Sequence, residues 1–177
     1  MLLPPVVLLV VAAAAQGMIP ARHPRAAGSV AAASVVAAAS AALATDALLR
    51  FHRHGTTVDP LRPTAAERLV TDGANALTRN PMYVAMAGAL LAHAVVRRSP
   101  AAVLPAAAFV VVLDRGQIAV EEAALADRFA ATYETYREQV PRWVDRRTAT
   151  TALAAAPRLV GRGVRRLGVR AGAAPPG

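Results

Sequence analysis

Long apolar runs alternate with short polar turns over the first two thirds of the chain. About 20 apolar residues in a helix, at 1.5 Å per residue, cross the roughly 30 Å hydrocarbon core of a bilayer. The first two runs reach that length. The third and fourth are shorter and are joined by a tight polar turn, which predicts a helical hairpin. The expected membrane spans are 1–19, 26–49, 82–97 and 100–118.

The N-terminal run has two interpretations. It carries no charged side chain, which suits a transmembrane helix, but the small residues Ala12–Ala15 would also suit cleavage by a signal peptidase. A signal peptide usually begins with a basic region, and no Lys or Arg precedes Gln16. We therefore expect a retained transmembrane helix.

The fourth run is expected to continue as an amphipathic helix that leaves the membrane. Apolar residues recur there at spacings of three to four with one gap of seven, which places them on one helical face. They are Ile118, Leu125, Phe129, Tyr133, Tyr136 and Val140. The predicted fold class is all-α: an integral membrane protein with about four transmembrane helices plus a cytoplasmic amphipathic helix.

The pattern divides the chain into a membrane domain, residues 1–147, and a basic tail, residues 148–177. Glycines and prolines break any helix in the tail, so we expect it to be flexible. An interfacial helix attracted to anionic lipid is the alternative. Because no aromatic residue lies among its arginines, we expect no nucleic-acid partner.

Composition and charge place this chain in a membrane and orient it. The 177 residues are 55% hydrophobic, lack cysteine and carry a net charge of +9. The lack of cysteine excludes a disulfide scaffold and Cys-ligated metal sites. Arginines concentrate on the side that holds both termini and the polar segment 51–81, which the positive-inside rule assigns to the cytoplasm. The expected location is the cell membrane, multi-pass, with both termini and the functional site cytoplasmic; the oligomeric state stays open.

The candidate chemistry on that side falls in segments 52–83 and 114–143. Glu121 and Glu122 are adjacent, so a helix directs them about 100° apart. One can enter a pocket while the other meets solvent, although a wholly solvated helical surface is the plainer interpretation. The sequence shows no spacing of metal ligands, no Gly-x-Ser-x-Gly and no Gly-rich phosphate motif. We expect no metal.

A second candidate is the loop-to-helix junction Arg79-Asn80-Pro81-Met82-Tyr83. Proline suits the first turn of a helix, and the amides at a helix N-terminus favour an anionic group such as a carboxylate. Anchoring of the chain at the membrane interface by Arg79 and Tyr83 is the alternative.

Together these residues resemble the isoprenylcysteine carboxyl methyltransferase and phospholipid methyltransferase family. The resemblance covers about half the chain, in order and with the family's spacings. Its pieces are Gly55-Thr56-Thr57, Pro60, Leu69-Val70-Thr71-Asp72-Gly73, Arg79-Asn80-Pro81-Met82-Tyr83, Gln117-Ile118, Glu121-Glu122, Leu125, Phe129, Tyr133, Tyr136 and Val140-Pro141-Arg142-Trp143.

The resemblance implies methyl transfer from S-adenosylmethionine, bound in a cytoplasmic pocket, to a small lipophilic acceptor or lipid. The acceptor group would be a carboxylate, thiol, amine or phenol. The cofactor-binding residues it implies are Glu67, Arg68, Leu69, Val70, Asn75, Asn80, Pro81, Met82, Tyr83 and Glu121, and the implied substrate-binding residue is Gln117.

The chain departs from the family pattern at several positions. No aromatic residue follows Gly73, where Asn75 is the nearest replacement, and Ala130 stands after Phe129 where a glycine is usual. Gln117 takes the place of an arginine tied to substrate in the eukaryotic enzymes, so prenylated protein carboxylates are not the expected acceptor. The alternative hypothesis is a catalytically degenerate membrane protein that retains the fold without methyl transfer.

Overall fold

The computed structural model describes residues 3–21, 26–54, 68–148 and 150–151. This part of the chain is helical and contains no strand, as the sequence predicted. The helices are α1 (Pro5–Met18), α2 (Ala27–His54), α3 (Ala74–Leu77), α4 (Pro81–Arg97), α5 (Val103–Val112) and α6 (Ile118–Gln139). A 3₁₀ turn, Pro100–Ala102, precedes α5, and a π-helical segment, Leu113–Gln117, joins α5 to α6 without a break.

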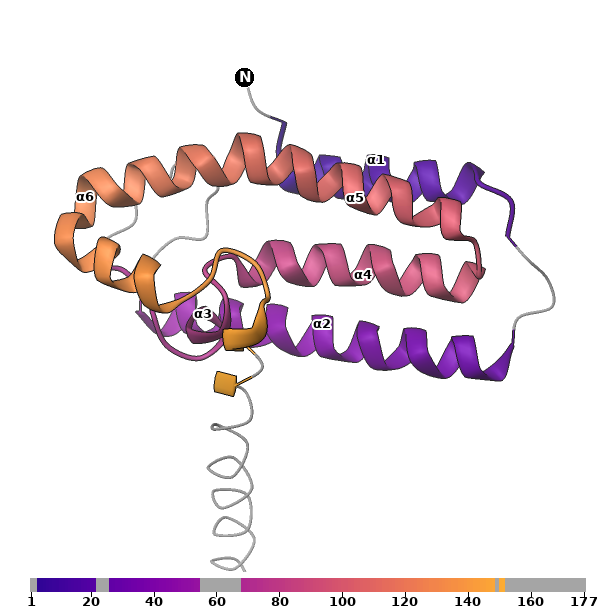
Figure 1. Ribbon diagram of the computed structural model, residues 1–177, viewed down its shortest axis with the longest axis horizontal. Helices are drawn as coiled ribbons and strands as arrows, with labels where there is room; N and C mark the ends of the chain where they lie inside the picture. Colours follow the sequence, from indigo (N-terminus) through magenta and orange to yellow (C-terminus); the bar gives the residue numbers. More distant parts are fainter. Residues whose placement is uncertain (1–2, 22–25, 55–67, 149, 152–177) are drawn as a thin grey trace, which may run out of the picture.

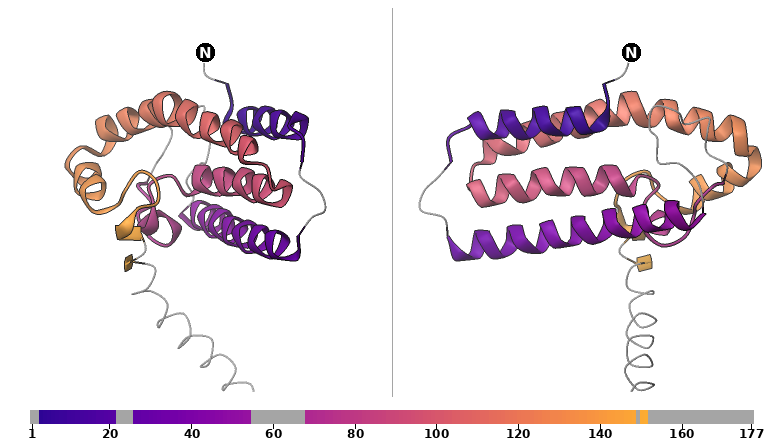
Figure 2. Two further views of the ribbon diagram at one scale, coloured as in Figure 1. Left: turned by 45° about the vertical axis from the view of Figure 1, so that its right-hand side comes forward. Right: turned by 180° about the vertical axis from the view of Figure 1, so that it is seen from behind.

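The four apolar helices form a layered bundle (Figure 1). Helix α4 lies in the middle, with α2 along one side and α1 and α5 along the other, and Figure 2 shows the same order from two further directions. Helices α2 and α4 approach each other closely: a Cβ atom built on Gly88 would stand 2.1 Å from the Ser40 hydroxyl oxygen. The small residues of these two helices therefore permit the tight packing that helices in lipid require.

A buried glutamine fastens α1 to the bundle. The Gln16 side chain is fully buried and donates to the carbonyl oxygens of Leu90, at 3.0 Å, and Ala102, at 2.6 Å. Its own amide oxygen lies 2.8 Å from Nδ1 of His93. The Gln16 side chain of α1 thus forms hydrogen bonds with both α4 and the 3₁₀ turn, and α1 packs as a member of this bundle.

Large apolar side chains cover the outer faces of the bundle. They include Val6, Val10 and Val11 on α1, Val35 and Leu49 on α2, Leu91 on α4, and Leu104, Val111 and Val112 on α5. Exposed apolar surface of this extent is unusual for a water-soluble monomer and suits contact with lipid. Two helices are long and apolar enough to cross a membrane, Ala27–Arg53 and Pro100–Gln139, and two apolar helices are shorter, Pro5–Met18 and Pro81–Arg97. The crossing of the shorter pair stays a prediction.

The structure differs from the expected boundaries in the polar segment. Helix α2 continues to His54, past the expected end at residue 49, and the short helix α3 forms where the sequence predicted only turns. The ion pair between Asp46 and Arg50, one turn apart, supports the last part of α2. Asp46, in the last turns of α2, lies beside the segment that leads into α3.

Helix α6 is also less regular than its apolar spacing predicted. Tyr133, Tyr136 and Val140 are buried together, with Leu125 and Phe129 partly buried against them. Between the two halves of the helix, Ala130 adopts φ 42° and ψ −121°, and the helix kinks there. A positive φ is uncommon for alanine because its Cβ crowds the backbone.

Candidate functional site

The half-buried carboxylate of Glu121 links the start of α4 to the start of α6. The Tyr83 hydroxyl donates to Oε1 of Glu121 at 2.6 Å, and Nε2 of Gln117 donates to the same oxygen at 2.8 Å. Tyr83 and Gln117 are both buried. Gln117 ends the π-helical segment and lies one helical turn before Glu121, so the two side chains share a face. Such π-helical segments occur frequently at functional sites.

The neighbouring Glu122 faces two arginines. Its Oε1 accepts from Nη2 of Arg79 at 2.7 Å and from Nε of Arg142 at 3.0 Å, while Oε2 pairs with Arg142 Nη2 at 2.5 Å. The Glu122 side chain is only 14% exposed. The two glutamates thus point in different directions, as helix geometry requires. The plainer interpretation, a wholly solvated helical surface, is wrong for Glu122. The arginines come from segments distant in the sequence, so local pattern could not reveal them.

Residues 140–143, here called the strap, lie along the loop before α4. The amide of Arg79 donates to the carbonyl oxygen of Pro141 at 2.9 Å. The carbonyl oxygen of Arg142 accepts from Oγ1 of Thr78 at 2.8 Å and from Nδ2 of Asn80 at 3.1 Å. The Asn80 side chain, expected at the cofactor, is therefore hydrogen-bonded to the strap.

The far end of the strap is held by Asp114 in the π-helical segment. One oxygen of Asp114 accepts from the Trp143 indole nitrogen at 2.7 Å and from Nη1 of Arg142 at 3.1 Å. Hydrogen bonds from Arg142 to the carboxylates of Glu122 and Asp114 raise the pKa of its guanidinium group above the usual range. The two arginines and two carboxylates balance in charge, which limits the cost of burying them.

A second group of predicted residues gathers around α3. Asp46 accepts from the amide of Ala74 at 2.7 Å, which fixes the start of α3 next to Gly73, where φ is 59°. Asn75 is buried, and the Tyr136 hydroxyl donates to its carbonyl oxygen at 2.7 Å. Its Nδ2 has no hydrogen-bond partner among the described residues. Tyr136 from α6 thus lies against Asn75, in the segment after Gly73 where the family pattern has an aromatic residue and this sequence has none. No local motif indicates this contact.

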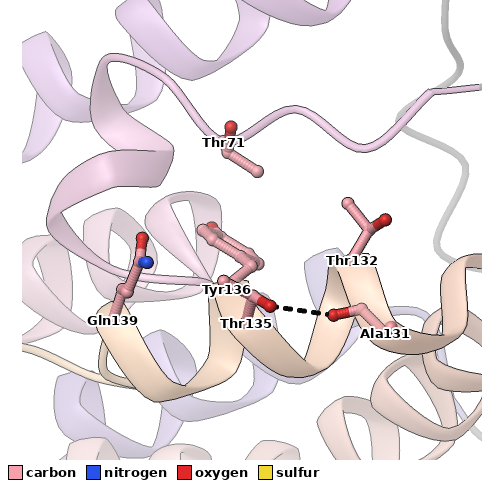
Figure 3. Close-up of a pocket in the computed structure, with 6 residues that line it drawn as sticks. All are labelled: Thr71, Ala131, Thr132, Thr135, Tyr136 and Gln139. Carbon is pink, nitrogen blue, oxygen red and sulfur yellow. Dashed lines mark hydrogen bonds between the residues drawn. The ribbon is translucent and has the colours of Figure 1, made fainter.

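A pocket of about 440 Å³ opens between this segment and the last turns of α6 (Figure 3). Its lining is polar but uncharged, and consists of Thr71, Ala131, Thr132, Thr135, Tyr136 and Gln139. None of the residues expected to bind cofactor or substrate lines it, although Thr71 directly follows the predicted segment 67–70.

The predicted site residues therefore fall into two groups. Tyr83, Gln117 and Glu121 meet directly, with Pro81 and Met82 at the start of the same helix as Tyr83. Leu69 packs on the cluster of Tyr133 and Tyr136, Val70 is buried, Asn75 lies against Tyr136, and Arg68 is exposed. Glu67 lies outside the described residues, as does nearly all of the tail. In the described ranges, no group of three or more His, Cys, Asp or Glu side chains gathers as metal ligands would.

Comparison with known proteins places most of this architecture in one family. The family model described as phospholipid methyltransferase matches residues 22–132, which run from before α2 into the second half of α6. The matched range contains Tyr83, Gln117 and Glu121. No curated protein and no solved structure matches the chain.

Proposed function

The chain belongs to the phospholipid methyltransferase family, a family of membrane methyltransferases, and we propose that it transfers a methyl group from S-adenosylmethionine to a small lipophilic acceptor at the membrane surface. The observation that supports this most strongly is the hydrogen-bonded Tyr83–Glu121–Gln117 arrangement inside the matched range. A partly buried carboxylate is costly unless hydrogen bonds or a bound cation compensate it.

The residues present fit S-adenosylmethionine, which carries a carboxylate, an ammonium group and a ribose. Glu121 offers an acceptor for the ammonium or ribose, because Tyr83 and Gln117 both donate to its Oε1 and its Oε2 can accept from a ligand. The first amides of α4 have no partner within the helix and suit the carboxylate. Asn75 Nδ2 and Arg79 Nε, buried without hydrogen-bond partners among the described residues, are further donors on the same side of the bundle.

The bound cofactor would supply an electrophilic methyl group on a sulfonium. In this proposal the chain's own residues bind and orient. Tyr83 and Gln117 hold the Glu121 carboxylate in one direction. The acceptor enters between helices from the lipid. Transfer by in-line displacement then needs positioning and desolvation and no covalent intermediate.

We further propose that all four apolar helices cross the membrane and that the site faces the cytoplasm. The charged contacts described above lie at one end of the bundle, where α2 ends and α4 begins. That end also carries the exposed Arg53, Arg68, Arg115 and Arg128. The opposite end carries only Arg97 and Arg98 among the described arginines, and the positive-inside rule assigns the richer end to the cytoplasm. Residues 1–147 would form the methyltransferase domain, with Thr148 still bonded to the Leu77 carbonyl oxygen at 2.8 Å.

Cofactor binding tests the proposal. Calorimetric titration of the detergent-solubilised protein with S-adenosylmethionine is expected to show micromolar binding that Glu121→Ala abolishes and Tyr83→Phe weakens. Glu134→Ala is the matched control, because Glu134 lies on the same helix in an exposed ion pair with Arg137. A folded, helical wild type that does not bind S-adenosylmethionine would instead support the degenerate protein that retains only the fold.

A further inference from the structure

We propose that the strap is a positioning element for the cofactor site, and that Glu122, Arg142 and Trp143 are positioning residues that act through it without touching the ligand. This inference rests on the proposed function. It assigns a role to the second glutamate and to the segment after α6.

The first step of the argument concerns the two glutamates. Glu121 and Glu122 are adjacent on one helix, so their side chains project about 100° apart around its axis. Contacts that fix the direction of one side chain therefore also fix the direction of the other. Glu122 is fixed by Arg79 and Arg142 together. Its ion pairs therefore hold α6 in the rotation that turns Glu121 toward Tyr83.

The second step concerns the start of α4. Every residue from Thr78 to Asn80 is bonded to the strap, through one backbone amide and two side chains. Nη1 of Arg79 also donates to the Val140 carbonyl oxygen at 2.8 Å. Tyr83 follows this loop by three residues, so a strap that moved away would release the N-terminal turn of α4.

The third step concerns the π-helical segment. Trp143 and Arg142 both bond to Asp114, and Gln117 lies in the same five-residue segment as Asp114. The strap thus contacts the three segments that carry Tyr83, Gln117 and Glu121.

The chain offers a direct reporter of the strap, because Trp143 is its single tryptophan. Acrylamide quenching of Trp143 fluorescence measures whether the strap is docked. Binding couplings are reciprocal: if docking of the strap favours cofactor binding, cofactor binding must favour docking to the same extent.

The experiment compares wild type with Glu122→Gln and with the control Glu134→Gln, which makes the same change in an exposed pair on the same helix. We expect Glu122→Gln to raise the Kd for S-adenosylmethionine at least about tenfold, within the usual range of couplings between sites. Trp143 quenching should increase in this variant and fall again when S-adenosylmethionine is added. Glu134→Gln should change neither quantity.

Trp143→Phe keeps an aromatic ring but removes the donor to Asp114, and it protects the test against a Glu122 variant that fails to fold. We expect Trp143→Phe to raise the Kd for S-adenosylmethionine about threefold. Loss of one hydrogen bond has this effect when its net contribution lies at the lower end of the usual range. Glu122→Asp should recover part of the lost affinity. Unchanged affinity in both Glu122→Gln and Trp143→Phe, beside normal wild-type binding, would overturn the strap proposal alone. A folded wild type without binding would overturn the proposed function and the strap proposal with it.

Discussion

Replacement of Ala130 by glycine should stabilise the protein, although it puts glycine into a helix. At φ 42° and ψ −121°, Ala130 has nearly the same backbone conformation as Gly73, at φ 59° and ψ −124°. This region is the first central position of a type II′ turn, which glycine dominates. An alanine there carries about 1–3 kcal/mol of backbone strain.

The opposing term is the greater freedom of glycine in the unfolded chain, about 0.4–1 kcal/mol. Ala130→Gly should therefore gain about 1.3 kcal/mol, the middle of the strain range less the middle of the entropy range. The matched control is Ala126→Gly, at an exposed, regular position of the same helix, which should lose up to about 1 kcal/mol. Thermal unfolding in detergent, followed by circular dichroism, should give a higher midpoint for Ala130→Gly and a lower midpoint for Ala126→Gly than for wild type. A fall in both midpoints by similar amounts would refute the assignment of strain to Ala130.

Two further predictions concern the glycines of the bundle. Gly88→Val should destabilise the protein by about 1–3 kcal/mol, as overpacking does, because the added atoms meet Ser40 on α2. Gly28→Val is the control: nothing lies within 4 Å of its added Cβ, so it should cost much less in the same unfolding assay. Gly73→Ala should cost about 1–3 kcal/mol in backbone strain. It should also displace Arg50, whose Nε would stand 1.6 Å from the new Cβ. Equal midpoints of thermal unfolding for Gly73→Ala and wild type would contradict this packing.

The helices were predictable from the sequence because apolar runs and helix stop signals are local. Pro81 begins α4, and α4 ends at Arg97. Arg98 follows in a left-handed conformation, directly before Ser99-Pro100. The ends of the polar segment were not predictable in this way. Helix α2 continues to His54, and Asp46 fixes the start of α3 through a contact between residues 28 positions apart.

The candidate site was predictable only in part for the same reason. Resemblance singled out Tyr83, Gln117 and Glu121, and the structure brings these three into contact. The partners of Glu122 come from loops that precede α4 and follow α6, and only the fold brings them together. The π-helical segment was missed because one extra residue in a turn leaves no signal in a short apolar pattern.

The most direct test of the central claim is transfer of a labelled methyl group. Purified protein in nanodiscs of host lipid is incubated with methyl-labelled S-adenosylmethionine, and the label is counted in the lipid-extractable fraction. We expect time-dependent incorporation by wild type and by Glu134→Gln, with loss of incorporation in Glu121→Gln. Incorporation by Glu121→Gln at the wild-type rate, or none by a folded wild type over a range of lipid mixtures, would contradict the account.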